Sequence, residues 1–134
     1  MAKGENQRLK LLYLAQILSR ETDDAHALTL EEIAARLNAQ QVTAERRTLY
    51  ADLQALKDFG YDVIAERRGR TVCYHLGSRD FQLPELKPLV DSVQSAKFIS
   101  ARKSRELIKK LEGLASKFDA THLQRQGLIS GRVK

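Results

Sequence analysis

The chain has 134 residues and a mass of 15.2 kDa, which suits one compact domain with an appendage and is too short for two full domains. Its 43% hydrophobic and 30% charged residues are an ordinary soluble composition, and no apolar run approaches the ~18 residues that a membrane-spanning helix needs. The net charge of +6 is uneven, because residues 1–82 hold 12 basic and 12 acidic side chains whereas residues 83–134 hold 11 and 5. Any nucleic-acid function of the first part must therefore depend on where its arginines lie.

The first apolar stretch predicts a helix from about Asn6 to Arg20. Its inward positions are expected to be Leu11, Leu12, Ala15, Ile17 and Leu18. A secretory signal is excluded, because Gln16 interrupts the apolar run and three acids separate it from the small residues at 25–27. Cys73 is the single cysteine, so no intramolecular disulfide can form. These features predict a cytoplasmic protein.

Two short helices across a turn are predicted next. Thr29, with Glu32 three residues later, is a capping box that begins the first helix, and Asn38 is expected to end it. Thr43 is expected to cap the second helix, which runs to Gly60. At about 100° per residue, one arc of this helix docks onto the core and holds Val42, Leu49, Leu53, Leu56 and Gly60. The opposite arc is free and holds Thr43, Ala44, Arg47, Ala51, Gln54 and Asp58.

A β-hairpin with a basic tip is expected after these helices. Its strands are two runs rich in Val, Ile, Tyr and Thr, at Tyr61–Glu66 and Thr71–Leu76, joined by Arg-Arg-Gly-Arg at 67–70. A helix with a free polar face, followed directly by such a hairpin, is the pattern of a winged helix-turn-helix. The fold class predicted is therefore mostly α with a small β-hairpin, with the winged domain over residues 1–78 and a polar tail at residues 1–5.

Residues 79–126 are predicted to be a helical linker or dimerisation segment. Pro84 and Pro88 suit the first turn of a helix that begins near Leu83. Its apolar stripe is expected to hold Leu86, Leu89, Val90, Val93 and Ala96.

A second helix of this segment is expected from Ser100, as its cap, through Lys117. Its stripe holds Leu107, Ile108, Leu111, Leu114, Ala115 and Phe118. This stripe either packs within the chain or pairs two chains, and the predicted dimerisation residues are Leu107, Leu111, Leu114 and Phe118. The polar side is basic, for which a solvated face is favoured over a direct contact with DNA or a partner. Residues 127–134 resemble the start of a further C-terminal domain.

The predicted DNA-binding residues lie on the free helix face and the hairpin tip. They are Thr43, Arg46, Arg47, Thr48, Tyr50, Gln54, Arg67, Arg68 and Arg70. Arg47 lies in the first turns of its helix, from which side chains reach base edges in the major groove. The hydroxyls of Thr48 and Tyr50 suit phosphate oxygens, and arginines at the tip suit bidentate phosphate contacts. Solvated arginines and a packed tyrosine ring are the simpler alternatives.

The sequence offers no support for an enzyme or a metal protein. His26, His75 and His122 lie in three different segments, without a second ligand at metal-binding spacing. No glycine-rich phosphate loop is present, and the paired acids at 23–24 and 31–32 are adjacent residues that point apart on a helix or favour its positive end. We therefore predict no catalytic residues, no metal and no cofactor.

Several stretches of this sequence resemble a known family. They are Leu30–Ala34, Ala44–Leu56, Asp80–Ile99, Lys103–Ala115 and Arg132–Lys134. In these the chain resembles bacterial winged-helix transcription regulators of the DeoR-like type that carry a C-terminal WYL domain. The resemblance implies a cytoplasmic, nucleoid-associated regulator, and we expect a homodimer on a pseudo-palindromic double-stranded operator.

The chain differs from that family at two positions, and one domain of the family is not present in this sequence. The turn between Asn38 and Thr43 is longer than in the tightest helix-turn-helix motifs, and Ala51 stands where relatives often carry a charged residue. The WYL domain, which in the family resembles the effector-sensing part, should begin where this sequence ends. A truncated regulator and a naturally short protein are both compatible with this, and the effector is unknown.

A second class of function competes with DNA binding. A winged helix also serves as a protein-interaction module, and such a chain could act as an anti-regulator that pairs with a full-length relative through its helices. A DNA-binding protein should associate with duplex DNA in a salt-dependent manner, whereas an interaction module should not.

Overall fold

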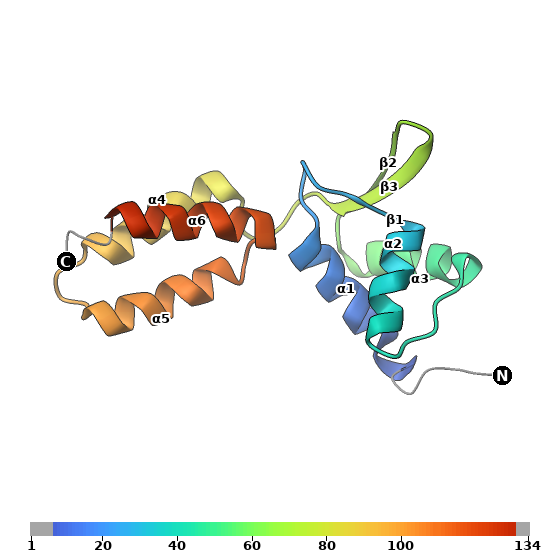
Figure 1. Ribbon diagram of the computed structural model, residues 1–134, viewed down its shortest axis with the longest axis horizontal. Coiled ribbons are helices and arrows are strands. Elements are labelled where there is room, and N and C mark those ends of the chain that lie inside the picture. Colours follow the sequence, from blue (N-terminus) through green and yellow to red (C-terminus); the bar gives the residue numbers. More distant parts are fainter. Residues whose placement is uncertain (1–6, 131–134) are drawn as a thin grey trace. The chain divides into compact units, whose positions relative to one another are not determined.

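A computed structural model of the chain describes the backbone of residues 7–130 and the side chains of residues 7–125. Over this range the chain is mostly helical, with six α-helices and one three-stranded antiparallel sheet (Figure 1), which confirms the predicted class at this level. Its contacts form two compact units, Met1–Ser78 (unit 1) and Arg79–Lys134 (unit 2). No helix in the described range has the length and apolar character needed to cross a membrane. The predicted polar tail at residues 1–5 and the family-like stretch at 132–134 lie outside the described residues.

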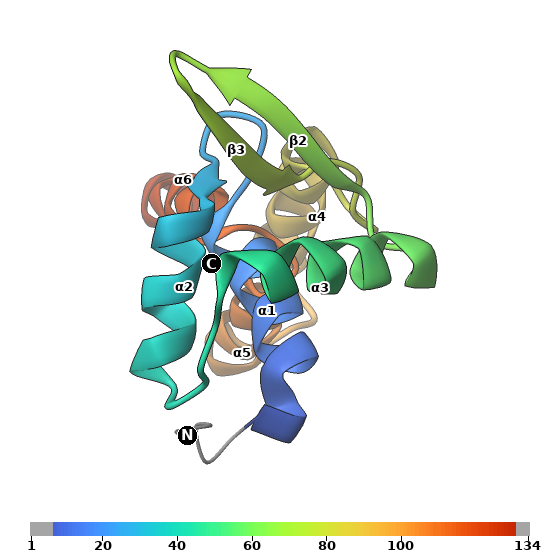
Figure 2. The same ribbon diagram turned by 90° about the vertical axis from the view of Figure 1, so that its right-hand side faces the viewer.

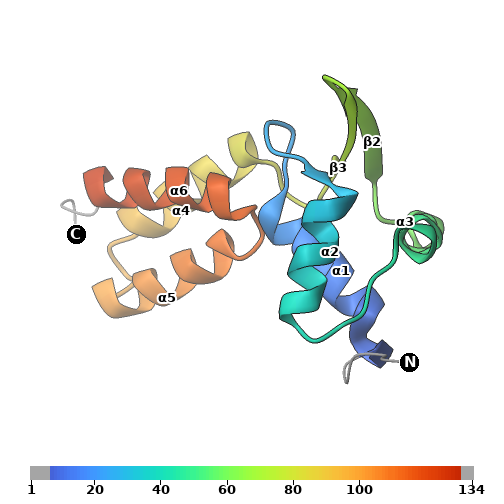
Figure 3. The same ribbon diagram turned by 45° about the vertical axis from the view of Figure 1, so that its right-hand side comes forward.

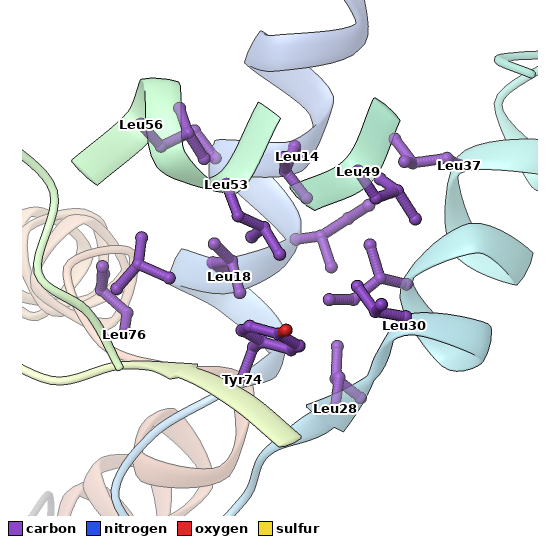
Figure 4. Packing of buried hydrophobic residues seen from close by; sticks show 14 of the residues in the cluster. Leu14, Leu18, Leu28, Leu30, Leu37, Leu49, Leu53, Leu56, Tyr74 and Leu76 are labelled. Atoms are coloured by element: carbon purple, nitrogen blue, oxygen red, sulfur yellow. The ribbon is translucent and has the colours of Figure 1, made fainter. Parts of the chain in front are cut away.

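Unit 1 begins with helices that build its core. A short 3-10 helix, η1 (Gln7–Leu9), leads into α1 (Lys10–Glu21), and α2 (Leu30–Ala39) and α3 (Arg46–Phe59) follow. Figure 4 shows leucines from all three α-helices and Tyr74 from the sheet meeting in one apolar cluster. Each α-helix supplies buried residues at helical spacing, which is why three short helices are stable together.

The inward face of α1 differs from the predicted one. Ala15, Ile17 and Leu18 are buried as expected, but Leu11 is 41% exposed and Leu12 is 68% exposed. Leu14, which is fully buried, stands at the centre of the face instead. Leu12 lies two residues before Leu14, a rotation of about 200° that directs it away from the core.

The sheet has the strand order β1–β3–β2 and is antiparallel throughout. Its strands are β1 (Leu28–Thr29), β2 (Val63–Arg68) and β3 (Thr71–Leu76). Strand β1, which was not predicted, places Leu28 opposite Tyr74. The buried Thr22 hydroxyl joins the end of α1 to the sheet, since it donates to the Leu18 carbonyl at 2.6 Å and accepts the Leu76 N–H at 2.9 Å.

The first strand of the hairpin has different bounds from the predicted ones, Val63–Arg68 in place of Tyr61–Glu66. Arg68 pairs with Thr71, so only Gly69 and Arg70 form the loop. Gly69 has φ +67° and Arg70 does not have a positive φ, which is the pattern of a type II′ turn. Strand β2 begins at Val63 and not at Tyr61, because the Tyr61 N–H donates to the Leu56 carbonyl and belongs to the end of α3. Gly60, with φ +130°, makes that end possible.

The connection between α2 and α3 differs from the prediction at both ends. Thr29 and Glu32 form the expected capping box, but α2 continues to Ala39 and the left-handed residue is Gln41, with φ 61°. Thr43 does not cap α3, which begins at Arg46. The Gln7 side-chain amide instead binds the backbone of Thr43, accepting its N–H at 3.1 Å and donating to its carbonyl at 3.0 Å. This contact between residues 36 apart keeps Thr43 outside the helix.

Unit 2 has three helices where two were predicted. They are α4 (Leu83–Ser95), α5 (Ala101–Glu112) and α6 (Lys117–Ser130), and Figures 1 and 3 show α4 and α6 side by side. Leu86, Val90, Ala115 and Leu123 form its buried core, with Ile108 and Leu111 packed against them. Unit 2 therefore has an apolar core of its own.

The predicted helix from Ser100 to Lys117 is interrupted. Ser100 caps α5 as expected, accepting the Lys103 N–H at 3.1 Å, but α5 ends at Glu112. The fully buried Ser116 then accepts the Asp119 N–H at 3.1 Å, as a residue that starts a new helix does. Residues 127–130, expected to open another domain, are the last turn of α6.

Two predictions within α4 also change. Pro84 lies in its first turn as predicted, but Pro88 lies inside the helix, where the carbonyl four residues earlier loses its usual donor. Leu89, expected in the apolar stripe, is 37% exposed, and the side chain that is buried near the end of the helix is Gln94.

Candidate nucleic-acid interface

Helix α3 presents one polar face to solvent. Leu49, Leu53 and Leu56 are buried beneath it, as the sequence predicted, and this fixes the rotation of the helix. Arg47, Ala51, Gln54 and Asp58 therefore project outward along one line of about three turns. The Gln54 amide donates to Asp58 at 2.8 Å on this exposed line.

Arg47 is the cation on that line with no competing acid. It is exposed, lies in the first turn of α3 and makes no ion pair with any described residue. A guanidinium in this position keeps all five of its donors available to a ligand.

Arg46, one residue earlier, is already paired. Its guanidinium forms an ion pair with Glu31 of α2 and interacts with the Tyr50 hydroxyl. The pKa of Glu31 lies below its usual value, because its own backbone N–H donates to the carboxylate and Arg46 adds an attraction. The attraction of Glu31 in turn raises the pKa of Arg46. Both side chains are more than 60% exposed, so a stronger anion can displace Glu31.

The predicted hydroxyl donor Thr48 is also occupied. Its hydroxyl donates to the Glu45 carbonyl at 3.0 Å and accepts from the Lys10 ammonium at 3.1 Å. Lys10 pairs in addition with Asp52 at 2.7 Å, so one α1 side chain is bound to two points of α3. The lysine and the aspartate are mostly buried, with side chains 11% and 22% exposed, and they fix α3 against α1.

The hairpin tip carries two free arginines and one structural arginine. Arg67 and Arg70 are exposed and form no ion pair among the described residues. Figures 1 and 2 show that this tip projects away from the three helices of unit 1. Arg67 and Arg70 are thus the two cations available at the tip.

Arg68 lies between them in sequence but points back to the unit. Its guanidinium donates to the Glu66 carboxylate, with Nε at 3.0 Å, and to the Asp24 carbonyl at 3.0 Å. This hydrogen bonding by Arg68 lowers the pKa of Glu66. Arg68 therefore ties the hairpin to the loop between α1 and β1, and its predicted phosphate contact would require these hydrogen bonds to be given up.

The buried His75 lies close to two residues that also bind Arg68, Asp24 and Glu66. His75 of β3 is 4% exposed, and its Nε2 lies 3.4 Å from an Asp24 carboxylate oxygen. Its Nδ1 lies 3.8 Å from Glu66. The Asp24 and Glu66 carboxylates therefore lie on either side of this ring, and its Nδ1 makes no hydrogen bond with any described residue.

The structure thus gathers the predicted DNA-binding residues into two places on unit 1. The α3 face holds Arg46, Arg47, Thr48, Tyr50 and Gln54, and the hairpin tip holds Arg67 and Arg70. Thr43 lies before α3 with its backbone bound to Gln7 and belongs to neither group. Sequence reasoning missed Glu31, Glu66 and Lys10 as partners. Only the Glu66–Arg68 pair left a local signal, because residues two apart share one face of a strand.

The predicted dimerisation stripe is divided in unit 2. Leu111 packs with Ile108 against the core of the unit, whereas Leu114 is 40% exposed. Leu107 and Phe118 are half-buried, and the Lys117 ammonium lies 5.3 Å from the centre of the Phe118 ring. Within the described range, no group of three or more His, Cys, Asp or Glu side chains could hold a metal ion.

Comparisons of this chain with protein-family models, with curated proteins and with solved structures found no match.

Proposed function

We propose that this chain is a sequence-specific, double-stranded DNA-binding transcription regulator. In this proposal unit 1 is a winged helix-turn-helix, with α2 and α3 as the helix pair and the β2–β3 hairpin as the wing. The observation that carries the proposal is the unpaired Arg47 on the outward line of α3, in the same unit as a projecting tip with free Arg67 and Arg70. The resemblance to DeoR-like regulators of the WYL family supports the same function.

The dimensions of α3 suit the major groove. Its 14 residues give a length of about 21 Å, and the groove is about 12 Å wide, enough to admit a helix. In helix-turn-helix proteins the N-terminal residues of the second helix contact base edges, and Arg47 occupies that part of α3. A bidentate contact from its guanidinium to a guanine is the commonest base-specific contact of arginine.

The other polar groups of unit 1 have supporting roles in this proposal. Lys10, paired with Thr48 and Asp52, holds α3 at a fixed rotation against α1. Arg68 is a positioning residue that holds the wing, and Arg67 and Arg70 contact phosphates. These contacts position the protein on the duplex without reading sequence.

A homodimer would give such a regulator two half-sites. Leu107, Leu114 and Phe118 keep exposed or half-exposed surface that a second copy could cover, whereas Leu111 is used within the chain. Two-fold symmetry on B-DNA would then place the half-sites about 10 base pairs apart, or a multiple of that distance. A cytoplasmic, nucleoid-associated location belongs to the same proposal.

One observation favours the alternative of a protein-interaction module. Phe59, at the end of α3, is 83% exposed and stacks on Tyr61 with ring centroids 6.1 Å apart. Aromatic side chains of this kind are enriched at protein interfaces. A partner protein bound there would use the opposite end of α3 from Arg47.

The experiment that tests the proposal is selection of duplexes from a random pool by the intact chain, followed by titration at several salt concentrations. We expect an enriched sequence, preferably two-fold symmetric, that binds at least 10³ times more tightly than a random duplex. A chain that enriches nothing, or that binds selected and random duplexes equally, would show that DNA is not read and would leave the interaction module.

A further inference from the structure

The excess positive charge of the chain lies entirely in unit 2. Met1–Ser78 contains 11 basic and 11 acidic residues, and Arg79–Lys134 contains 12 and 6. In unit 1, moreover, Lys10, Arg36, Arg46 and Arg68 already bind acids of the same unit. Unit 1 alone therefore has no excess positive charge, and a reduced number of unpaired cations, to attract a polyanion.

Helix α5 concentrates the excess charge on one surface. Its 12 residues include five cations, Arg102, Lys103, Arg105, Lys109 and Lys110, which we call the α5 basic face. All five are exposed, and the buried Ser104 with the core-facing Ile108 and Leu111 fixes the rotation of the helix. The apolar side of α5 is thus inside the unit and only its cationic side meets solvent.

Acids neutralise this face only in part. Glu106 is shared by Arg102, at 3.8 Å, and Lys103, at 3.5 Å, and all three side chains are at least half exposed. Arg105, Lys109 and Lys110 form no ion pair with any described residue. Three cations of the α5 basic face are therefore free to bind an anion.

We infer that the α5 basic face is a second, sequence-independent contact for the phosphate backbone of duplex DNA. From Arg105 to Lys110 the helix rises by about 7.5 Å, and one DNA strand carries a phosphate every 3.4 Å or so of duplex axis, which gives two to three phosphates over that length. Three unpaired cations match this number. A membrane surface fits less well, because the apolar face that would enter the lipid packs into the core of the unit.

This inference deepens the proposed function, on which it rests for the choice of DNA as partner. Base reading stays with α3, and the α5 basic face adds affinity that is the same for every sequence. It would allow a chain with a neutral unit 1 to bind a polyanion at physiological salt.

The test replaces Arg105, Lys109 and Lys110 by Gln in the intact chain and measures binding to a random-sequence duplex between 50 and 300 mM salt. Each lost phosphate contact removes about 0.9 from the slope of log affinity against log salt, so the triple variant should lose about 2–3. The matched control replaces Lys87, Lys97 and Arg125 by Gln, which removes the same charge from other parts of unit 2. The control should keep nearly the full slope, and both variants should melt like the wild type.

An unchanged slope in the α5 variant, or an equal loss in the control, would overturn the inference. The inference would also be overturned if the wild type bound vesicles with 30% anionic lipid as tightly as duplex DNA and the α5 substitutions abolished that binding. The ratio of affinities for selected and random duplexes separates this inference from the proposed function. An affinity ratio near one in the wild type would refute base reading by α3. A high affinity ratio, together with a salt slope that the α5 substitutions leave unchanged, would refute only the second contact.

Discussion

At the scale of single residues, neighbouring arginines of unit 1 have different roles. Arg47 is free and Arg46 is bound to Glu31, although both are exposed in the first turn of α3. Arg70 is free and Arg68 is bound to Glu66 and to the Asp24 carbonyl. Availability to a phosphate or a base is therefore decided by the partner of each guanidinium and not by exposure alone.

Glu31→Gln should strengthen DNA binding. The substitution removes the acid that holds Arg46 and removes a negative charge near the duplex, so Arg46 becomes available for a phosphate. We expect tighter binding to all duplexes and a salt slope that is steeper by about 0.9, measured by fluorescence anisotropy. Asp91→Asn in α4 removes the same charge elsewhere and should change neither quantity. Weaker binding by Glu31→Gln would show that Glu31 orients Arg46 productively.

Asp62 should make the stability of unit 1 depend on acid pH. The Ser78 N–H donates to its carboxylate at 2.7 Å, and this bond lowers the pKa of Asp62 from the usual 3.8. A lowered folded-state pKa contributes stability that is complete above the unfolded value and is lost as the pH falls from there through the folded value. The urea midpoint of the wild type should therefore exceed that of Asp62→Asn at pH 6, and the difference should shrink towards pH 2.5. A difference in urea midpoint that stays constant from pH 6 to pH 2.5 would show that the ionised Asp62 carboxylate is not the source of the extra stability.

At the scale of elements, the rotation of α3 determines which side chains reach a ligand. Leu53→Ala should reduce the stability of the chain by about 2–5 kcal/mol, because it empties a 5% exposed position in the core. Gln54→Ala, one residue later on the outward line, should leave the melting temperature nearly unchanged. Thermal unfolding followed by circular dichroism compares the two. Equal losses would mean that α3 is rotated away from the position described.

The elements that could be predicted from the sequence are those whose signals are long and local. The buried arc of α3 follows from three apolar positions at helical spacing, Leu49, Leu53 and Leu56, and the hairpin follows from two β-rich runs around Gly69. Strand β1 has only two residues and no periodicity, so it could not be predicted. Thr43, expected to cap α3, instead binds Gln7, which is 36 residues away and left no local signal.

The break between α5 and α6 was missed although signals for it exist. The apolar stripe continues from α5 across the break at nearly helical spacing, so periodicity alone predicts one helix. Gly113 and the Ser116–Asp119 pair mark the true boundary, as a stop and a cap.

For the candidate site, the sequence could place arginines at the hairpin tip, but the carbonyl of Asp24 that binds Arg68 lies 44 residues away and left no local signal.

At the scale of the whole molecule, the pairing of two chains should depend on surface that unit 2 does not use itself. Leu114→Glu should convert a dimer into a monomer without lowering the melting temperature, because Leu114 is 40% exposed. Leu111→Ala should instead lower stability, since Leu111 packs on the core of the unit. Light scattering with thermal unfolding distinguishes the two effects. A monomeric wild type would rule out pairing through this surface.

The division of labour between α3 and the hairpin tip is tested most directly by comparing Arg47→Ala with Arg70→Ala on a selected and a random duplex. Arg47→Ala should weaken binding to the selected duplex by about 1–3 kcal/mol, relax the preference at one base position and change binding to the random duplex far less. Arg70→Ala should weaken both duplexes alike and lower the salt slope by about 0.9. If both substitutions weakened both duplexes to the same extent, α3 would not be reading bases.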